Sequence, residues 1–314
     1  LVGSEMCIRD RNMDVDDAIN WQLFAEICCE VPAYTCPANQ EWPTHGQNYG
    51  RTGYSTNIIG DLTNFGKLWE WQGDNLIAYG HPVIANELVY IATYDEIVAL
   101  DIYTGALVWQ TGNPVAGFHP DYQVFMGNAN NYMVTTPTVE DGRIYFGTGR
   151  SSLNEGIVCA DAFTGDTIWV RHADLGSPLP GGISGMTGEM QYTVPVILGD
   201  NVYFGTSFGV LYALDKLTGA DVWNVMLDQG IVFSPSSDGT DLFVGTSDAG
   251  AGPGGTVYKI SALDGSTIAT WAGYEGGAGN EWFDVAPVYN SEEDALYVAG
   301  TIPTFVGATQ ALLM

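Results

Sequence analysis

The sequence predicts an all-β fold, a β-propeller built from four-stranded antiparallel blades. The first observation is a repeat: ALDIYTGALVW at 99–109 returns as CADAFTGDTIW at 159–169 and as ALDKLTGADVW at 213–223. The second is that short runs rich in Val, Ile, Tyr and Phe precede each repeat, separated by Gly and Asp turns, as in antiparallel strands. The third is that no segment with a 3.6-residue hydrophobic period lies between the repeats, which disfavours a parallel βαβ sheet.

Each repeat unit has the same internal order. A proline-containing segment and a tight turn are followed by two strand-like runs, and a Thr-Gly turn then leads into a final strand that ends in tryptophan. The tryptophans are Trp109, Trp169, Trp223 and, in a degraded copy, Trp271, so the spacings are 60, 54 and 48 residues. A four-stranded unit that recurs at this period is typical of a propeller blade.

Three positions of the repeat have a structural interpretation. The aspartate ends the third strand, where its carboxylate can accept hydrogen bonds from turn amides. The glycine supplies the positive φ of a tight turn. The tryptophan lies on the outer strand and is expected to pack between blades, because so large a side chain needs a buried surface. These docking positions are Asp101, Gly105, Trp109, Asp161, Gly165, Trp169, Asp215, Gly219, Trp223 and Trp271.

The repeat also predicts how many blades the chain contains. Complete blades are expected at about 80–110, 134–170, 192–226 and 232–272, with a lone outer strand at 66–72 and a half blade at 284–301. Joining the lone strand to the half blade would close a ring of five.

The segment before the propeller carries no repeat. Residues 1–11 fit nothing downstream and are interpreted as a non-native translated artefact, and residues 12–40 form a cysteine-containing N-terminal segment ahead of the propeller at 41–314. Within that segment a disulfide from Cys36 to Cys28 or Cys29, a bond between the adjacent cysteines, and unpaired thiols all remain open. No signal peptide is visible.

The charge balance excludes some functions. The chain has 9 Lys and Arg residues against 37 Asp and Glu residues, a formal net charge of −28. So acidic a surface repels phosphate backbones and anionic lipids, which argues against nucleic-acid binding. No apolar run is long enough to span a membrane. The acidity is interpreted as a solubility feature.

The repeat resembles the tryptophan-docking motif, A-x-D-x-x-T-G-x-x-x-W, of the PQQ-type propeller superfamily. That superfamily includes quinoprotein alcohol dehydrogenases, polyvinyl-alcohol dehydrogenase-like proteins, which are nearest in character, and the non-enzymatic BamB-type assembly lipoproteins. The motif is complete at 99–109 and 213–223, has Cys159 in place of alanine in the second copy, and is degraded at 261–271. The segment EWPTHGQNYGRTGYS at 41–55 also resembles the lead-in W-x-x-x-G-x-x-x-x-x-T-G of such propellers.

This resemblance covers about residues 41–301 and implies several properties. The family has seven or eight blades, which favours a C-terminally truncated ring over a ring of five. It also implies a periplasmic or secreted location, and a PQQ cofactor held together with Ca²⁺ if the protein is one of the dehydrogenases.

The long insertions of the chain should gather at one end of the blades. The turns after the first and third strands of each blade are short and share one end, here called the short-turn face. The opposite end, here called the long-loop face, receives the long connections at 111–133, 149–156, 171–192 and 247–255. Long loops on a rigid scaffold are the usual place for binding.

Candidate cofactor residues lie on these long connections. The three carboxylates of PQQ need Arg or Lys partners, and Arg150 and Arg171 are the candidates. Calcium needs oxygen ligands, for which Glu155, Asn128 and Glu189 are the candidates. None of these residues stands in a recognisable motif. The alternative interpretation is that the arginines are solvated loop charges and that the asparagine serves turn geometry.

Two functions therefore follow from the sequence. The resemblance and the long loops favour part of a quinoprotein-like oxidoreductase that oxidises a small alcohol. The alternative is a non-catalytic, BamB-like binding or assembly propeller that holds a protein partner on its long-loop face. The scarcity of basic residues and the absence of an identifiable catalytic base favour that alternative.

Overall fold

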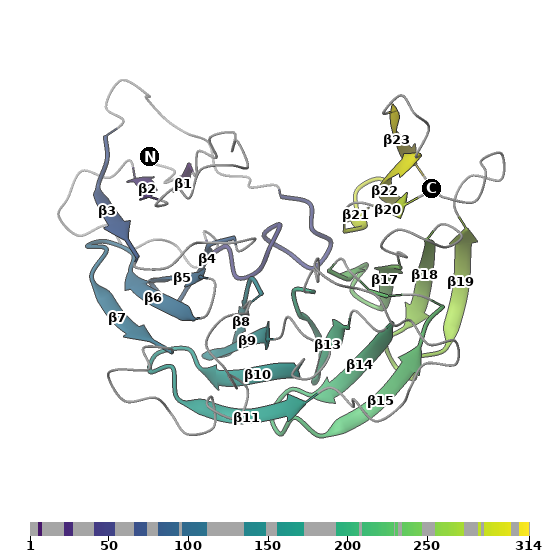
Figure 1. The fold of residues 1–314 in the computed structure, drawn as a ribbon, viewed down its shortest axis with the longest axis horizontal. Helices are drawn as coiled ribbons and strands as arrows, with labels where there is room; N and C mark the ends of the chain where they lie inside the picture. The colour runs from purple at the N-terminus through teal and green to yellow at the C-terminus, as the bar shows by residue number, and fades with distance from the viewer. Residues whose placement is uncertain are drawn as a thin grey trace, which may run out of the picture.

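The computed structural model is an open arc of β-sheets (Figure 1). It describes residues 6–7, 22–27, 41–53, 66–73, 81–93, 96–111, 135–148, 156–172, 193–206, 209–228, 230–231, 234–246, 255–272, 282–283, 286–302 and 308–313. Within these ranges no helix has the length and hydropathy that a membrane crossing requires.

Four consecutive sheets have four antiparallel strands each, paired in sequence order, and they are the blades that the repeat predicts. Blade 1 consists of β4 (Val83–Ala85), β5 (Leu88–Ala92), β6 (Ile97–Asp101) and β7 (Leu107–Gln110). Blade 2 consists of β8 (Thr138–Glu140), β9 (Arg143–Thr148), β10 (Gly156–Asp161) and β11 (Thr167–His172). Blade 3 consists of β12 (Val196–Leu198), β13 (Asn201–Gly205), β14 (Val210–Asp215) and β15 (Asp221–Met226). Blade 4 consists of β16 (Ser236–Ser237), β17 (Asp241–Gly245), β18 (Thr256–Ser261) and β19 (Thr267–Ala272).

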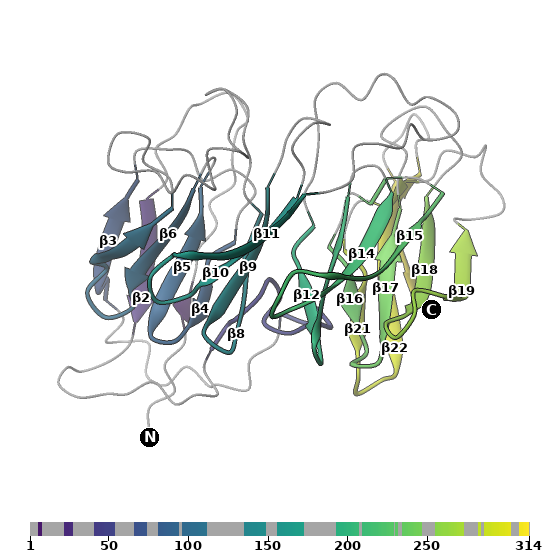
Figure 2. The same ribbon diagram turned by 90° about the horizontal axis from the view of Figure 1, so that it is seen from below.

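The two ends of the arc carry further sheets. Blade 5 contains β20 (Trp282–Phe283), β21 (Val288–Asn290), β22 (Ala295–Ile302) and β23 (Ala308–Leu313). The sheet at the other end contains β1 (Met6–Cys7), β2 (Gln22–Ile27) and β3 (Trp69–Gln72). The first strand of each complete blade lies on the concave side of the arc, and the fourth lies on its circumference (Figures 1 and 2).

The prediction of a propeller of four-stranded antiparallel blades is confirmed. Four strands lie outside the predicted elements: β1, β2, β20 and β23. β1 falls in the segment interpreted as an artefact and pairs with β2, and β20 lies just before the predicted half blade. The last sheet was expected to end at residue 301, but β23 adds a strand to it by pairing with β22. The strand at 66–72 was expected to stand alone, but β3 pairs with β2, for which the sequence offers no repeat or turn signal. A ring larger than five blades stays a prediction.

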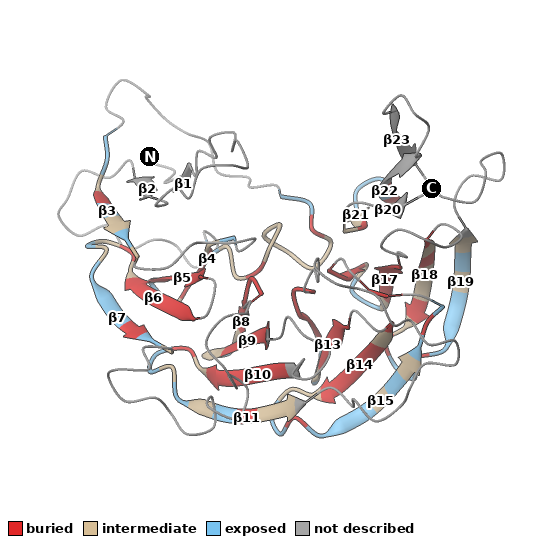
Figure 3. Ribbon diagram, viewed as in Figure 1, coloured by how far each residue is buried: buried red, intermediate tan, exposed pale blue. Residues whose placement is uncertain are grey.

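The hydrophobic core lies between the blades. One cluster joins Tyr90 and Trp109 of blade 1 to Phe146 and Val158 of blade 2. Similar clusters join blade 2 to blade 3 and blade 3 to blade 4. Figure 3 shows buried strands toward the middle of each blade and exposed outer strands. Since each sheet buries both of its faces, its inner strands are nearly continuous apolar runs.

Each outer-strand tryptophan contacts the following blade. Trp109 Nε1 donates a hydrogen bond to the Ala162 carbonyl at 2.9 Å. Its ring lies over Gly165, where a Cβ would come within 2.7 Å of the ring. The same arrangement joins Trp69 to Ile102 and Gly105, Trp169 to Lys216 and Gly219, and Trp223 to Ala262 and Gly265. Each copy of the repeat therefore carries both a tryptophan and the glycine surface that receives the preceding one.

A tyrosine on the second strand reinforces this contact. The Tyr90 hydroxyl donates to the same Ala162 carbonyl at 3.2 Å, and its ring centroid lies 6.0 Å from that of Trp109. Tyr145 with Trp169, and Tyr203 with Trp223, share an acceptor in the same way. One backbone carbonyl per blade thus accepts two side-chain donors from its neighbour.

The shared acceptor makes the two donors energetically coupled. We expect Trp109→Phe and Tyr90→Phe each to lower the free energy of unfolding by about 1 kcal/mol, because one donor still satisfies the Ala162 carbonyl. The double variant should lose more than the sum, since the buried carbonyl is then unpaired. Urea denaturation of the four proteins measures this coupling, and strict additivity would contradict it.

The degraded fourth copy keeps the outer-strand geometry. Trp109 pairs with Ala99, two residues before the motif aspartate, whereas Trp271 pairs with Val257, four residues before Ser261. A displacement of two residues leaves a side chain on the same face of a strand. Trp271 accordingly packs against the cluster between blades 4 and 5 that contains Phe243.

The motif aspartate and glycine shape the turn between them. Asp101 Oδ1 accepts hydrogen bonds from the amide and the hydroxyl of Thr104 at 2.8 and 2.7 Å. Asp215 bonds Thr218 in the same way. Gly105 follows with a φ of 67°, a left-handed conformation that favours glycine. The whole turn lies on the short-turn face.

Candidate binding site on the propeller axis

Residues 41–53, here called the axial segment, run along the concave side of the arc (Figure 1). Backbone hydrogen bonds attach the segment to the innermost strands. They join Trp42 to Ile84 of β4, the Pro43 carbonyl to Val139 of β8, the Tyr49 carbonyl to Ser237 of β16 and the Gly50 carbonyl to Tyr289 of β21. The segment therefore bridges blades that lie far apart in the sequence.

Arg51 is the centre of this arrangement. Its side chain is buried, with 5% of the residue exposed. The guanidinium donates to the carbonyls of Val194 and Pro235, both at 3.1 Å, just before the first strands of blades 3 and 4. It also donates to Thr44 Oγ1 at 2.9 Å and to the His45 carbonyl at 2.8 Å. Burial lowers the pKa of Arg51 to about 10, so it stays charged at neutral pH.

Two further polar contacts hold the axial segment to blade 2. Thr44 and Thr138 share a buried hydroxyl hydrogen bond of 2.9 Å. The Tyr49 hydroxyl donates to Glu140 at 3.0 Å, and Glu140 in turn pairs with Lys216 of blade 3 at 2.8 Å. Burial and the neighbouring Glu140 raise the pKa of Tyr49, which therefore stays protonated as a donor.

Two histidines stack beside Arg51. The rings of His45 and His81 lie 4.3 Å apart and 18° from parallel. His81 lies two residues before β4, at the end of blade 1 where the long connections arrive. Burial, followed by the charges of His81 and Arg51, lowers the pKa of His45 to about 3. His45 is therefore neutral at physiological pH, and Arg51 supplies the fixed charge of the axis.

The low pKa of His45 predicts a pH dependence of stability. Below its ordinary pKa of 6.5 the unfolded chain binds a proton that the folded protein does not, so stability falls from about pH 6.5 toward pH 3. Between pH 7 and pH 5 this group alone should cost about 2 kcal/mol. Urea denaturation at both pH values, with His45→Gln as the comparison, isolates the effect. Equal pH slopes for the two proteins would contradict it.

The structure places Arg171 on β11, the outermost strand of blade 2. Its guanidinium forms two hydrogen bonds with the Asp221 carboxylate of β15, at 2.6 and 2.7 Å, and lies over the Tyr212 ring. The hydrogen bond to Arg171 also lowers the pKa of Asp221. Two of the three guanidinium nitrogens of Arg171 are therefore already bonded to a carboxylate. The proposed role of Arg171 in cofactor binding stays a prediction.

The other predicted cofactor residues lie outside the described part of the chain. They are Arg150, Glu155, Asn128 and Glu189. The long connections that carry them are outside it as well, apart from residues 111, 156, 171–172 and 255. Among the described residues, no group of three or more His, Cys, Asp or Glu side chains is arranged to hold a metal ion. The only described cysteine with a described side chain, Cys159, is a free, buried thiol.

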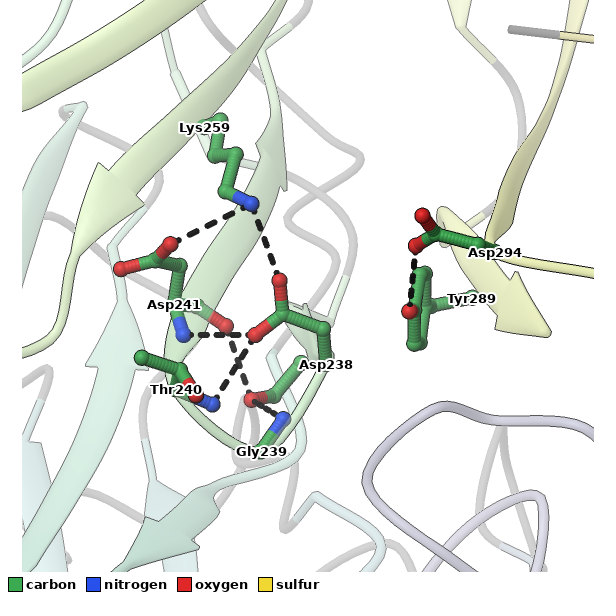
Figure 4. A network of polar contacts seen from close by, with 8 residues as sticks. Asp238, Gly239, Thr240, Asp241, Lys259, Tyr289 and Asp294 are labelled. Atoms are coloured by element: carbon green, nitrogen blue, oxygen red, sulfur yellow. Dashed lines mark hydrogen bonds and ion pairs between the residues drawn. The ribbon is translucent and has the colours of Figure 1, made fainter. Parts of the chain in front are cut away.

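The described lysines are committed to local ion pairs. Figure 4 shows Lys259 of β18 between two carboxylates, those of Asp238 and Asp241. The distances are 3.0 and 3.2 Å, and both aspartates lie where the chain turns into β17. The same figure shows the separate hydrogen bond from Tyr289 to Asp294 in blade 5. Lys216 and Lys67 pair with Glu140 and Glu70. These pairs fix turns and neighbouring blades.

The axial residues were not assigned a role from the sequence. His45 and Arg51 both stand in the lead-in segment at 41–55, whose pattern indicates the family but not the role of either residue. One signal for their role was available in the sequence. The chain has few basic residues, and one of them lies between two glycines and close to a histidine. Its partners, however, lie in other blades and share no local pattern with it.

Comparisons with known proteins agree on the repeat. The family model described as outer membrane protein assembly factor BamB matches residues 61–188 and 155–302. The dehydrogenase subunit of an alcohol dehydrogenase (quinone) from Gluconobacter oxydans is 29% identical over 134 residues, which cover 41% of this chain and 16% of that protein. BamB from Moranella endobia is 26% identical over 164 residues, which cover 52% of this chain and 33% of that protein.

A solved structure agrees as well. A europium-containing methanol dehydrogenase superposes with a TM-score of 0.57 at 12% identity, covering 87% of this chain and 73% of that one. At this identity the likeness establishes the fold alone. Of the two curated relatives, the alcohol dehydrogenase subunit and the Moranella endobia BamB, this chain covers a third or less of the length.

Proposed function

This chain belongs to the family of PQQ-type repeat propellers described as outer membrane protein assembly factor BamB, and from that premise we propose that it is a non-catalytic binding propeller. It would hold a protein partner on its long-loop face and act outside the cytoplasm. The blades and the axial segment form the rigid support, and the unrepeated loops supply the recognition.

The count and placement of basic residues carry this proposal. The chain has 9 Lys and Arg residues, and every one that the structure describes already has a partner. These are Arg51, Lys67, Arg143, Arg171, Lys216 and Lys259. The others are Arg150 and the two arginines at 9 and 11, in the segment interpreted as non-native. Within residues 41–314, Arg150 is thus the one basic residue outside the described part.

The described residues consequently do not fit bound PQQ. Carboxylates are held by charge-assisted hydrogen bonds, which need donors that are free to turn toward the ligand. At the axis, Arg51 already donates hydrogen bonds to Thr44 and to three backbone carbonyls. His45 is neutral there. A trianion placed above it would also meet the repulsion of a chain with a net charge of −28.

Cofactor titration separates the proposal from its rival. We expect the full-length protein, titrated with PQQ and Ca²⁺, to show no quenching of its tryptophan fluorescence beyond that of free tryptophan. We also expect no reduction of an artificial electron acceptor in the presence of short primary alcohols. Saturable quinone binding with alcohol-dependent turnover would overturn the non-catalytic assignment.

A second measurement tests the binding role itself. The full-length protein, expressed in a bacterium that lacks its own BamB, should restore the level of assembled outer membrane proteins. A variant in which a short Gly-Ser turn replaces residues 113–133 should fail, whereas Lys67→Ala, at an exposed ion pair, should succeed. Equal rescue by the loop variant, or no rescue by the intact protein, would count against a partner on the long-loop face.

A quinoprotein-like oxidoreductase is the second candidate. The observation in its favour is the similarity to the quinone-dependent alcohol dehydrogenase subunit, 29% identity over 134 residues. In that case Arg150 would contact the quinone, and Glu155, Asn128 and Glu189 would hold the calcium ion. Loss of PQQ binding in Arg150→Ala, with binding unchanged in Arg143→Ala, would support this reading.

A further inference from the structure

The short-turn face carries a row of exposed apolar side chains. The position two residues after the motif aspartate is Phe163 in blade 2 and Leu217 in blade 3, and the matching position of the degraded copy in blade 4, two residues after Ser261, is Leu263. These three residues are here called the turn row. Their exposed fractions are 53%, 53% and 85%. All stand in the turn between the third and fourth strands, so they lie on the same end of neighbouring blades. Tyr103 occupies this position in blade 1, where it is partly buried.

Folding does not require apolar residues at this position. The carboxylate of Asp161 accepts the Phe163 amide at 2.8 Å, and Asp215 accepts the Leu217 amide at 3.1 Å. These bonds shape the turn through the backbone, whatever the side chain. Such turns favour polar residues, and isolated exposed apolar residues are common. Here, however, exposed apolar side chains recur at one position of the motif in successive blades of an acidic protein. Such a recurrence indicates a surface that binds something.

Exposed carboxylates flank the turn row. Asp166 and Asp264 are exposed on the same turns, and the Asp141 side chain is 76% exposed on the neighbouring turn of blade 2. Two described cations lie nearby, and both are engaged: the Lys216 side chain is 13% exposed and pairs with Glu140 and Asp141, and Arg143 donates a hydrogen bond to the Leu217 carbonyl at 3.1 Å. The surface thus combines projecting apolar groups with carboxylates.

We propose that the turn row docks a segment of a partner protein in which apolar and basic side chains alternate. The apolar side chains would pack on the turn row, and the basic ones would pair with the flanking carboxylates. A second copy of this chain would set carboxylates against carboxylates. An anionic membrane would meet the same repulsion. A cationic, apolar polypeptide is the occupant whose charge complements this face.

This surface is separate from the proposed binding role of the long-loop face. The turns of the turn row lie at the opposite end of the blades, and the axial segment and inner strands lie between the two ends (Figure 2). The partner on the turn row would therefore bind without competing for the long loops, and either proposal can fail without the other.

The test uses synthetic peptides and two matched triple variants. The probe is a short, fluorescently labelled peptide of alternating leucine and lysine, and binding to the full chain is followed by anisotropy. The variants are Phe163→Ser/Leu217→Ser/Leu263→Ser and, as the control, Val108→Ser/Ile168→Ser/Val222→Ser. The control residues are equally apolar and are exposed by 47%, 42% and 46% on the outer strands.

We expect the turn-row variant to bind the peptide more than about tenfold more weakly than the unaltered protein, because several apolar contacts are lost. The control variant should bind it unchanged, and a serine–lysine peptide should bind weakly to all three proteins. Equal thermal midpoints would show that the variants are folded.

Several results would overturn the proposal. They are unchanged affinity in the turn-row variant, an equal loss in the control variant, and equal binding of the serine–lysine peptide. Self-association in sedimentation that the turn-row variant abolishes would identify a second copy as the occupant instead. Binding to vesicles of anionic lipid that depends on the turn row would identify a membrane.

Discussion

Replacing Arg51 by methionine is expected to lower the free energy of unfolding by about 3 to 5 kcal/mol. The substitution removes hydrogen bonds to the carbonyls of His45, Val194 and Pro235, and it leaves these polar groups without their donor. Because the guanidinium joins the axial segment to blades 3 and 4, the loss should also reduce the cooperativity of unfolding. Urea denaturation followed by tryptophan fluorescence measures both quantities.

Two controls distinguish the geometry of Arg51 from its charge. Arg51→Lys keeps the charge but lacks the planar fork that reaches two blades at once, so we expect it to recover less than half of the loss. Lys67→Ala removes an exposed pair with Glu70 and should cost less than about 0.5 kcal/mol. Full stability in Arg51→Lys would mean that a buried charge, and not the set of hydrogen bonds, holds the axis together.

Replacing Gly165 by alanine is expected to cost about 3 to 4 kcal/mol. The glycine has a φ of 76°, where an L-residue is strained, and the new Cβ would lie within 2.7 Å of the Trp109 ring. The ring would have to leave its place between blades 1 and 2 and would lose its hydrogen bond to Ala162. Thermal and urea denaturation measure the cost.

Gly199 is a matched control for this substitution. Its φ is 59°, and no atom lies within 4 Å of the position that a Cβ would take. Gly199→Ala therefore carries the backbone strain alone, about 1 kcal/mol. The difference between the free energies of unfolding of the two variants isolates the contact with tryptophan. Equal costs would mean that the tryptophan ring moves aside without an energetic penalty. A near-ultraviolet circular dichroism change confined to Gly165→Ala would show that the ring has moved.

The blades could be predicted because their information is local. The strand runs, the turn glycines and the docking tryptophan of one blade fall within about sixty residues, and each repeat contains both a ring and the surface that receives the preceding ring. Even the degraded fourth copy follows, since moving Trp271 by two residues keeps its side chain on the same face. The strand β2 offered no such repeat, and it was not predicted.

The candidate site was predicted far less well. Its loops could be placed on one face because antiparallel strands alternate in direction. The roles of single residues could not be assigned, because a loop arginine has the same local sequence whether it faces a ligand or a neighbouring strand. Arg171 illustrates this: its partner Asp221 lies on the next blade. Only the assembled strands show that its charge is already paired.

The sequence by itself determined the all-β class, the four-stranded blade and the way one blade docks on the next. Only the tertiary structure decided what fills the axis. Arg51 reaches Pro235 and Val194, which lie 184 and 143 positions further along the chain. Neither acceptor is a side chain, so no residue type marks it in the sequence. The docking motif repeats because each blade packs against a similar neighbour. The axis occurs once in the fold, so its contacts have no repeated pattern in the sequence.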